Sequence, residues 1–322
     1  MVNGYQYNED CSYIPVHMNA IFNSKWLSFE IDLVDEVIGS MFIEYIRNVK
    51  SEYIIIDLDK MKTAHSRVFE EYSGLSGEGK NLVFVNADDT LLSHITGTIT
   101  GVIFEDGVLF STRQGQEYYD KVLNVNHNFS DQLKYNLGKI TADYLKNHSL
   151  KKDIFLESSN IYSNMYVDVK QLFNNAPIYL LTVYRLCKLI DTQLNKNEYD
   201  GFICASNNGS VLSTMLTLML NKKSTYIMNL GPHLTIMDKE TIDKIKVNGK
   251  YAFIFDFVCL GTELKLVKTV VSLQGAKVVG MFGVAKHHLP SRSHPERKYD
   301  PTLNALVSVN DDYDFGYIVS IV

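Results

Sequence analysis

A short turn in the C-terminal half of the chain could bind an anion. The apolar run Tyr251–Phe255 predicts a buried strand, and Glu263–Leu273 predicts a helix. Between them stand Leu260, Gly261 and Thr262. Glycine lets the backbone approach an anion without a Cβ in the way, and a helix start presents unpaired N–H groups. The turn is therefore a candidate phosphate cradle; the alternative is an ordinary strand-to-helix turn.

A second polar turn follows another predicted strand, Gly201–Ala205, and precedes a predicted helix, Val211–Leu220. Its residues are Ser206, Asn207, Asn208 and Gly209. Asparagine and glycine tolerate unusual backbone angles, which suits a loop around an anion but also suits any tight turn. Asp256 stands directly after the other strand, either as a ligand group or as a simple cap.

The elements around these turns alternate in a regular way. Helix 178–194 precedes strand 201–205, and strands 224–228, 251–255 and 276–282 follow, with helices 211–220 and 263–273 between them. Strands and helices joined by short turns predict an open parallel α/β sheet, in which ligands bind at the carboxyl ends of the strands. The turns at 205–210 and 256–262, with the loop 229–250, are therefore where function is expected.

The first half reads as a smaller α/β arrangement. We expect residues 1–24 to be irregular and Lys25–Leu33, with its alternating pattern, to be a strand. The further expected elements are helix 37–49, strand 51–57, helix 65–72, strand 81–86, helix 88–94, a hairpin over 98–112 and a long helix at about 129–147. The polar tail of that helix places a domain boundary between residues 1–147 and 148–322.

Composition narrows the class of protein. The chain has 322 residues, 46% of them hydrophobic and 21% charged, with a net charge of −6. These values fit a globular protein of two domains and give no reason to expect nucleic acid or an anionic membrane as partner. Cys11, Cys187, Cys204 and Cys259 form no C-x-x-C pair, and no stretch is long and apolar enough to cross a membrane. We expect free thiols and a cytoplasmic protein.

The stretch 155–175, FLESSNIYSNMYVDVKQLFNN, resembles the opening of orotate phosphoribosyltransferases, which have the form F-x-L-x-S-G-x-x-S-x-x-Y-x-D. DGFICASNNGSVLSTMLTLML at 200–220 and YAFIFDFVCLGTELK at 251–265 then follow in the family's order. The resemblance covers about residues 150–290. It implies the open parallel sheet of a type I phosphoribosyltransferase, binding phosphoribosyl pyrophosphate with magnesium, in an assembly that is often a homo-oligomer.

The resemblance also implies roles for individual residues. Asp256, Leu260, Gly261 and Thr262 would hold the ribose and its 5′-phosphate, and Ser206, Asn207, Asn208 and Gly209 would contact pyrophosphate. Glu157, Ser158 and Tyr166 would line the base pocket. The family has a second acidic residue where this chain has Phe257, and a lysine where it has Glu157. Basic residues are also missing directly after strand 224–228, so orotate is not expected to be the substrate and the catalytic set looks degenerate.

Residues 25–97 are similar, more loosely, to anti-sigma-factor antagonist (STAS) domains, through YIIIDLDKMKTAHSRVFEEYSGL at 53–75. The resemblance implies a domain that binds partner proteins and a phosphorylation site near Ser66, which otherwise serves as a helix cap. The sequence thus predicts a protein that binds a phosphorylated ribose or nucleotide in a regulatory role. An active phosphoribosyltransferase with a non-orotate acceptor and a ligand-free scaffold remain as alternatives.

Overall fold

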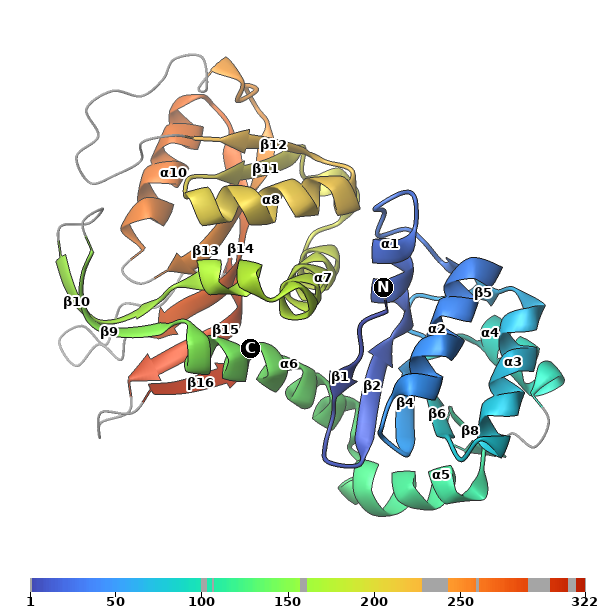
Figure 1. Cartoon of the computed structure of the whole chain (residues 1–322). Helices are drawn as coiled ribbons and strands as arrows, with labels where there is room; N and C mark the ends of the chain where they lie inside the picture. Colours follow the sequence, from blue (N-terminus) through green and yellow to red (C-terminus); the bar gives the residue numbers. More distant parts are fainter. Residues whose placement is uncertain are drawn as a thin grey trace. The chain divides into compact units, whose positions relative to one another are not determined.

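The computed structural model describes residues 2–99, 103–105, 107–156, 161–227, 243–258, 261–288, 302–311 and 317–321. The chain forms two compact units, Met1–Asn136 and Leu137–Val322 (Figure 1). The division falls inside the long helix α6 (Phe129–His148), whereas the sequence places the domain boundary at the end of that helix. Each unit is described by itself below.

The first unit is a mixed sheet with helices. Its elements are β1 (Tyr5–Gln6), β2 (Cys11–Pro15), α1 (Val16–Asn23), β3 (Leu33–Val34), α2 (Glu36–Asn48), β4 (Tyr53–Asp57), β5 (Thr63–Ala64), α3 (Ser66–Gly77), β6 (Asn81–Val85), α4 (Asp89–Thr98), β7 (Ile103–Glu105), β8 (Val108–Phe110), α5 (Arg113–Tyr118), η1 (Tyr119–Leu123) and η2 (Val125–His127). The large sheet has the order β1-β2-β4-β6-β8-β7, in which β2, β4 and β6 are parallel and each remaining pair is antiparallel.

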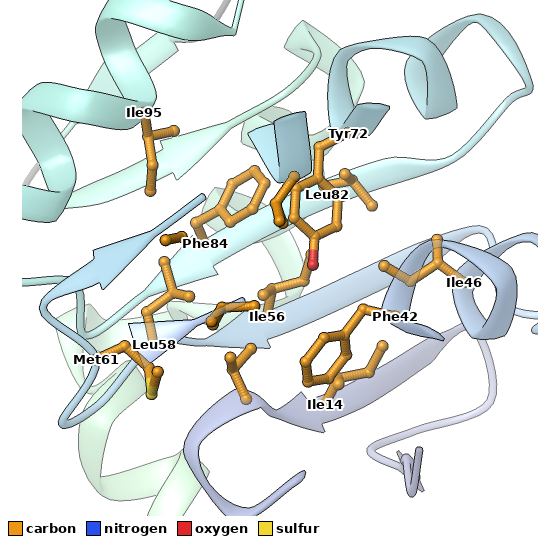
Figure 2. Close-up of a cluster of buried hydrophobic side chains, with 14 of the residues drawn as sticks. Ile14, Phe42, Ile46, Ile56, Leu58, Met61, Tyr72, Leu82, Phe84 and Ile95 are labelled. Carbon is orange, nitrogen blue, oxygen red and sulfur yellow. The ribbon is translucent and has the colours of Figure 1, made fainter. Parts of the chain in front are cut away.

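One hydrophobic cluster holds this unit together. Phe42 of α2, Tyr72 of α3 and Ile95 of α4 all pack toward Ile56 and Phe84 of the sheet, as Figure 2 shows. The helices therefore cover the same face of the parallel strands. The apolar runs 54–56 of β4 and 82–85 of β6 are explained by this burial, because a central strand exposes neither face.

Two expectations for the first unit were wrong. Residues 1–24 are not irregular, since β2 is buried along its whole length and pairs in parallel with β4. The alternating stretch Lys25–Leu33 is not a strand; only Leu33 enters a short one, β3. The stretch makes local backbone bonds, from Ser28 N to the Trp26 oxygen and from Ile31 N to the Ser28 oxygen, instead of a ladder. Trp26 is 78% exposed, whereas Phe29 is buried, so the stretch buries side chains without pairing as a strand.

The second unit is built on a parallel sheet. After α6 its elements are β9 (Leu150–Leu156), β10 (Ile161–Val167), η3 (Val169–Asn174), α7 (Ala176–Gln193), η4 (Lys196–Glu198), β11 (Gly201–Cys204), α8 (Asn207–Leu220), β12 (Lys223–Tyr226), β13 (Lys250–Val258), α10 (Thr262–Leu273), β14 (Lys277–His288), β15 (Leu303–Asp311) and β16 (Tyr317–Ile321). The sheet order is β12-β11-β13-β14-β15-β16; β9 and β10 form a separate antiparallel pair. The first five strands are parallel and β16 is antiparallel, as the sequence predicted for an open parallel sheet.

Helices cover both faces of this sheet. Phe253 and Phe255 of β13 share a buried cluster with Val267 of α10. Side chains alternate along a strand, so Ile254 lies on the opposite face. That face carries α8, because a Cβ on Gly209 of α8 would lie 3.1 Å from the backbone oxygen of Ile254. Figure 1 shows α7 and α8 packed side by side, and the two helices are in contact.

The strand order reverses at one point of the sheet. The chain builds β11, moves outward to β12, and then returns to the other side of β11 with β13. The helices α8 and α10, which follow β11 and β13, therefore cover opposite faces of the sheet. A crevice at the carboxyl ends of two such strands is where open α/β sheets bind ligands. In this unit the place that corresponds to the crevice is the carboxyl edge of the sheet between β11 and β13.

Candidate functional site

Asp256 lies near the end of β13, at this edge of the sheet. Its carboxylate is buried, with 8% of the residue exposed. The hydroxyl of Ser206 donates to Oδ1 at 2.9 Å, and the side-chain amide of Asn208 donates to Oδ2, also at 2.9 Å. Both oxygens are thus held by residues that follow the neighbouring strand. The structure brings together Asp256 and the Ser206–Gly209 turn, which the sequence assigns to two separate subsites.

The polar turn after β11 is the first turn of a helix and not a loop, which corrects the sequence interpretation. Ser206 is the N-cap of α8, and its hydroxyl oxygen accepts from the backbone N–H of Gly209 at 2.9 Å. Gly209 is required for close packing on Ile254 rather than for an unusual backbone angle. Asn207 accepts a hydrogen bond from the hydroxyl of Tyr226 at 2.8 Å, which ties the helix start to β12. A helix N-terminus therefore opens on the crevice.

A second helix start follows β13. Gly261 is the N-cap of α10 and has φ 71° and ψ 12°, a left-handed conformation that favours glycine. It has no side chain to cap the first N–H groups of α10, which remain for another partner. Thr262 is the first residue of the helix. Leu260, the third residue of the expected cradle, lies outside the described residues.

Asp256 and Phe257 both lie inside β13, which is longer than the sequence indicated. Asp256 faces α8, so the neighbouring side chain of Phe257 points to the other face of the sheet. There Phe257 meets Tyr166 of β10 edge to face, with ring centroids 5.7 Å apart. Phe257, where the resemblance to orotate phosphoribosyltransferases led us to expect a second carboxylate, thus packs against a candidate base-pocket residue. Glu157 and Ser158, the other two residues of that pocket, lie outside the described residues.

Two acidic groups beside Asp256 have raised pKa values. Burial, and then the charge of Asp256, raises the pKa of Glu263 to about 7, although Glu263 lies in the first turn of a helix. Burial, followed by the charges of Asp256, Asp168 and Glu263, raises the pKa of Tyr166 to about 12. At neutral pH the phenol is therefore neutral, and a substantial fraction of Glu263 carries its proton.

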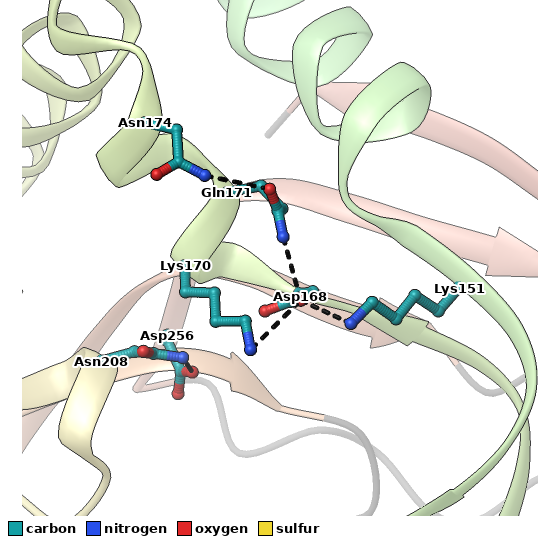
Figure 3. Close-up of polar contacts among 7 residues, drawn as sticks. All are labelled: Lys151, Asp168, Lys170, Gln171, Asn174, Asn208 and Asp256. Atoms are coloured by element: carbon teal, nitrogen blue, oxygen red, sulfur yellow. Dashed lines mark hydrogen bonds and ion pairs between the residues drawn. The ribbon is translucent and has the colours of Figure 1, made fainter.

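A cluster centred on Asp168 adjoins this site. The Oδ2 atom of Asp168 receives Lys151 Nζ at 2.6 Å, Gln171 Nε2 at 3.3 Å and Lys170 Nζ at 3.8 Å. The side chain of Asp168 is 3% exposed, while those of Lys151 and Lys170 are 47% and 60% exposed. Figure 3 draws the amine of Lys170 between Asp168 and the pair formed by Asn208 and Asp256.

The sequence interpretation missed this cluster. Asp168 was available as the last residue of the Y-x-D motif, but Lys151 stands in a polar tail that reads as a domain boundary. The structure makes that segment the start of β9, paired with β10, so that Lys151 lies opposite Tyr166 in the register. Lys151 near the start of the hairpin and Asp168 just after its end carry opposite charges. That pair was the signal in the sequence that could have revealed the cluster.

Two further features predicted from the sequence lie wholly or partly outside the residues that the structure describes. Ser66 is the first residue of α3, after the N-cap His65, but its side chain lies outside the described residues. Residues 228–242, most of the loop expected to face the crevice, also lie outside them.

Within the described ranges no group of three or more His, Cys, Asp or Glu side chains could hold a metal ion. Among the helices described, none is long and apolar enough to cross a membrane.

Comparisons with solved structures find phosphoribosyltransferases over about half of the chain. An adenine phosphoribosyltransferase from Thermoanaerobacter pseudethanolicus matches at 12% identity, covering 52% of this chain and 98% of its own, with a TM-score of 0.40. One from Trypanosoma brucei, in complex with AMP, pyrophosphate and ribose-5-phosphate, matches at 13% identity over 56% and 84%, with a TM-score of 0.40. An orotate phosphoribosyltransferase from Aeropyrum pernix matches at 19% identity over 46% and 81%, with a TM-score of 0.36.

No family model matches the chain, and no curated protein does. With TM-scores below 0.5, the structural similarities assign neither a residue nor an activity. The α/β fold of the second unit, its five parallel strands and its reversed strand order follow from the pairing of its own strands.

Proposed function

We propose that the second unit binds a phosphorylated ribose or a nucleotide in the crevice between β11 and β13. The observation that carries the proposal is the buried carboxylate of Asp256, which accepts from Ser206 and Asn208 at the start of α8 and acts electrostatically on Glu263 in the first turn of α10. The start of each helix favours a negative group, and backbone N–H groups suit phosphate oxygens. The carboxylate suits hydroxyl donors such as those of a ribose.

The two helix starts have different parts in this proposal. The first turn of α8 is capped by Ser206, so its N–H groups are partly satisfied. The first turn of α10 begins at Gly261 with no side-chain cap, and takes the 5′-phosphate. Ribose hydroxyls would donate to Asp256 by displacing Ser206 or Asn208, whose side chains then turn to the ligand. The affinity for the phosphate is therefore expected to exceed that for the sugar.

The role that fits this site is regulation or sensing, with the first unit supplying contacts to a partner protein or a second copy of the chain. The single carboxylate and the Phe257–Tyr166 contact support a degenerate site. An active phosphoribosyltransferase with a non-orotate acceptor is the second candidate, because the lysines around Asp168 can neutralise a leaving anion. In either case magnesium would come with the phosphates of the ligand, and Asp256 is the residue able to face it.

Calorimetry with the full chain tests the proposal. We expect ribose 5-phosphate and adenosine monophosphate to bind at least about tenfold more tightly than ribose and adenosine, because each phosphate hydrogen bond to a helix start is charge-assisted. Asp256→Asn should weaken both phosphorylated ligands while the far-ultraviolet circular dichroism spectrum stays unchanged.

Two results would contradict the proposal. One is equal affinity for the phosphorylated and unphosphorylated ligands. The other is an absence of binding to either at millimolar concentration, which would favour the scaffold alternative. Formation of a nucleoside monophosphate from phosphoribosyl pyrophosphate and a free base would keep the site and replace the regulatory role with catalysis.

A further inference from the structure

Trp26 is an exposed aromatic side chain of the first unit. It is the single tryptophan of the chain and is 78% exposed, whereas tryptophan is mostly buried in folded proteins. Its backbone is fixed, because its carbonyl oxygen accepts from the backbone N–H of Ser28 and from the hydroxyl of Ser24, both at 2.6 Å. Phe29, just after it, is buried against the ring of His17, with centroids 5.1 Å apart. An anchored segment thus holds an exposed indole.

Two further apolar side chains are exposed close to Trp26 along the chain. Leu33 of β3 is 47% exposed, and Val37 in the first turn of α2 is 70% exposed. A rigid tryptophan with apolar neighbours is the kind of residue that dominates protein–protein contacts, since it buries a large area at little cost in conformational entropy. The stretch 26–37 is therefore a candidate docking surface.

The second unit has a hollow of a size that suits such a side chain. The hollow is shallow, has a volume of about 360 Å³ and is lined by Lys268, Thr269, Ser272 and Leu273, on the C-terminal half of α10. Leu273 is 75% exposed. Val247 is also exposed and lies near Gly275, where an added Cβ would be 3.4 Å from its Cγ1 atom. The hollow thus offers apolar contacts, and Lys268 supplies a cation that can interact with an indole ring.

The two units carry net charges of opposite sign. Residues 1–136 contain 10 Lys or Arg and 20 Asp or Glu, a net charge of −10, whereas residues 137–322 contain 21 and 17, a net charge of +4. Two exposed lysines, Lys250 and Lys277, lie opposite one another in the register at the start of β13 and β14, close after the end of α10. Like charges so placed repel one another. An acidic partner would relieve that repulsion and be steered toward this end of the second unit.

We propose that Trp26 of one copy of the chain docks in the hollow on α10 of a second copy, with Leu33 and Val37 beside it. The first unit has the exposed aromatic residue and the negative charge, and the second unit has the hollow and the positive charge. Because the contact joins two different surfaces, two copies can form it reciprocally or pass it on to further copies. It uses the end of α10 opposite to the proposed ligand site and does not depend on that site.

The fluorescence of Trp26 in the full chain tests the proposal, because no other tryptophan contributes. We expect the emission maximum to lie at a shorter wavelength at about 100 μM chain than at about 1 μM, since the indole leaves water when copies associate. Sedimentation velocity over the same range should show the association. Raising the salt concentration from about 0.15 M to about 1 M should weaken it severalfold, because the Debye length falls from about 8 Å to about 3 Å.

Two variants each remove one side of the contact. Leu273→Asp places a carboxylate in the hollow, and Trp26→Ala removes the docking side chain; each should weaken association at least about tenfold. Both positions are exposed, so the circular dichroism spectrum should stay unchanged. Leu218→Asp is the matched control, because Leu218 is an exposed leucine of α8, on the other face of the sheet. It should associate as the wild type does.

A mixture of the two variants tests for contact between copies. Of these two chains only Leu273→Asp has a tryptophan, and only Trp26→Ala has an intact hollow. Adding Trp26→Ala in excess should therefore shift the emission of Leu273→Asp to a shorter wavelength. The proposal is overturned if the mixture shows no shift, if the wild-type emission does not change with concentration, or if Leu273→Asp associates as strongly as Leu218→Asp.

Discussion

Both units place a buried aspartate at the carboxyl end of a central parallel strand, and the two differ in what surrounds it. Asp57 ends β4 in the first unit, with 7% of the residue exposed. Tyr13 donates its hydroxyl to Oδ2, and the Asn86 amide and the backbone N–H of Asp59 donate to Oδ1 at 2.9 and 3.0 Å. Asp256 has a similar burial but accepts from the first turn of a helix.

Strand order explains the difference. In the first unit β2, β4 and β6 follow one another in space as they do along the chain. The chain after Asp57 turns back over the strand end, and Leu58 and Met61 close it as part of the hydrophobic core. In the second unit the order reverses between β11 and β13, so the helices that follow these two neighbouring strands cover opposite faces of the sheet. The same residue type is an anchor of a turn in one unit and a candidate ligand group in the other.

The largest effect that would test this comparison is on stability in the first unit. Asp57→Ala leaves the Tyr13 hydroxyl and the Asn86 amide without their acceptor, and we expect a loss of about 3 kcal/mol in the free energy of unfolding. Ligand affinity should not change. Urea denaturation followed by circular dichroism measures the loss, and Glu44→Ala, at an exposed position of α2, is the control. Loss of ligand binding in Asp57→Ala would break the comparison, because Asp57 would then belong to a site.

A smaller effect is expected at Glu263. Its pKa is about 7 in the folded chain against a usual value of 4.5, so the folded state keeps a proton that the unfolded state releases. Stability from this group therefore falls as the pH rises from about 4.5 to 7 and is then constant. Glu263→Gln should be near neutral at pH 4.5 and stabilising by about 2 kcal/mol at pH 8.

Asp89 offers the contrast in the first unit. It lies in the first turn of α4 as Glu263 does in α10, but it is exposed. Asp89→Asn should cost a few tenths of a kcal/mol at neutral pH, through the helix dipole, with the opposite sign to Glu263→Gln. Thermal unfolding between pH 4.5 and 8 measures both. If the difference in stability between Glu263→Gln and the wild type did not change with pH, Glu263 would not have the raised pKa that its burial predicts.

A stability effect smaller than that at Glu263 is expected at two glycines. Gly261 has φ 71° and Gly79, before β6, has φ 82°, and a Cβ added to either would meet no atom closer than 4.0 Å. Alanine at either should therefore cost about 1 kcal/mol for the left-handed conformation alone. Gly261→Ala should also weaken ribose 5-phosphate binding, while Gly79→Ala should leave it unchanged. If the two variants bound ribose 5-phosphate with equal affinity, the start of α10 would not be part of the phosphate site.

Local patterns predicted most of the secondary structure in both units. The apolar runs YIIID and FIFDF and the amphipathic stretch 37–49 became β4, β13 and α2, because burial of a whole strand or of one helix face leaves a periodic signature. The pattern misled at Lys25–Leu33, where alternation occurs without a partner strand. It also ended β13 too early, since Asp256 and Phe257 are polar and bulky yet remain in the ladder with β14.

The sequence by itself determined most of the candidate residues, since the turns at 206–209 and 261–262 stand between a predicted strand and a predicted helix and can be read locally. Only the tertiary structure decided which of them meet. Asp256 contacts Ser206 and Asn208 across about fifty residues because β13 returns to the side of β11, and nothing local encodes that return. Lys170 reaches the same edge because a hairpin register, set by pairing rather than by residue type, places Asp168 there.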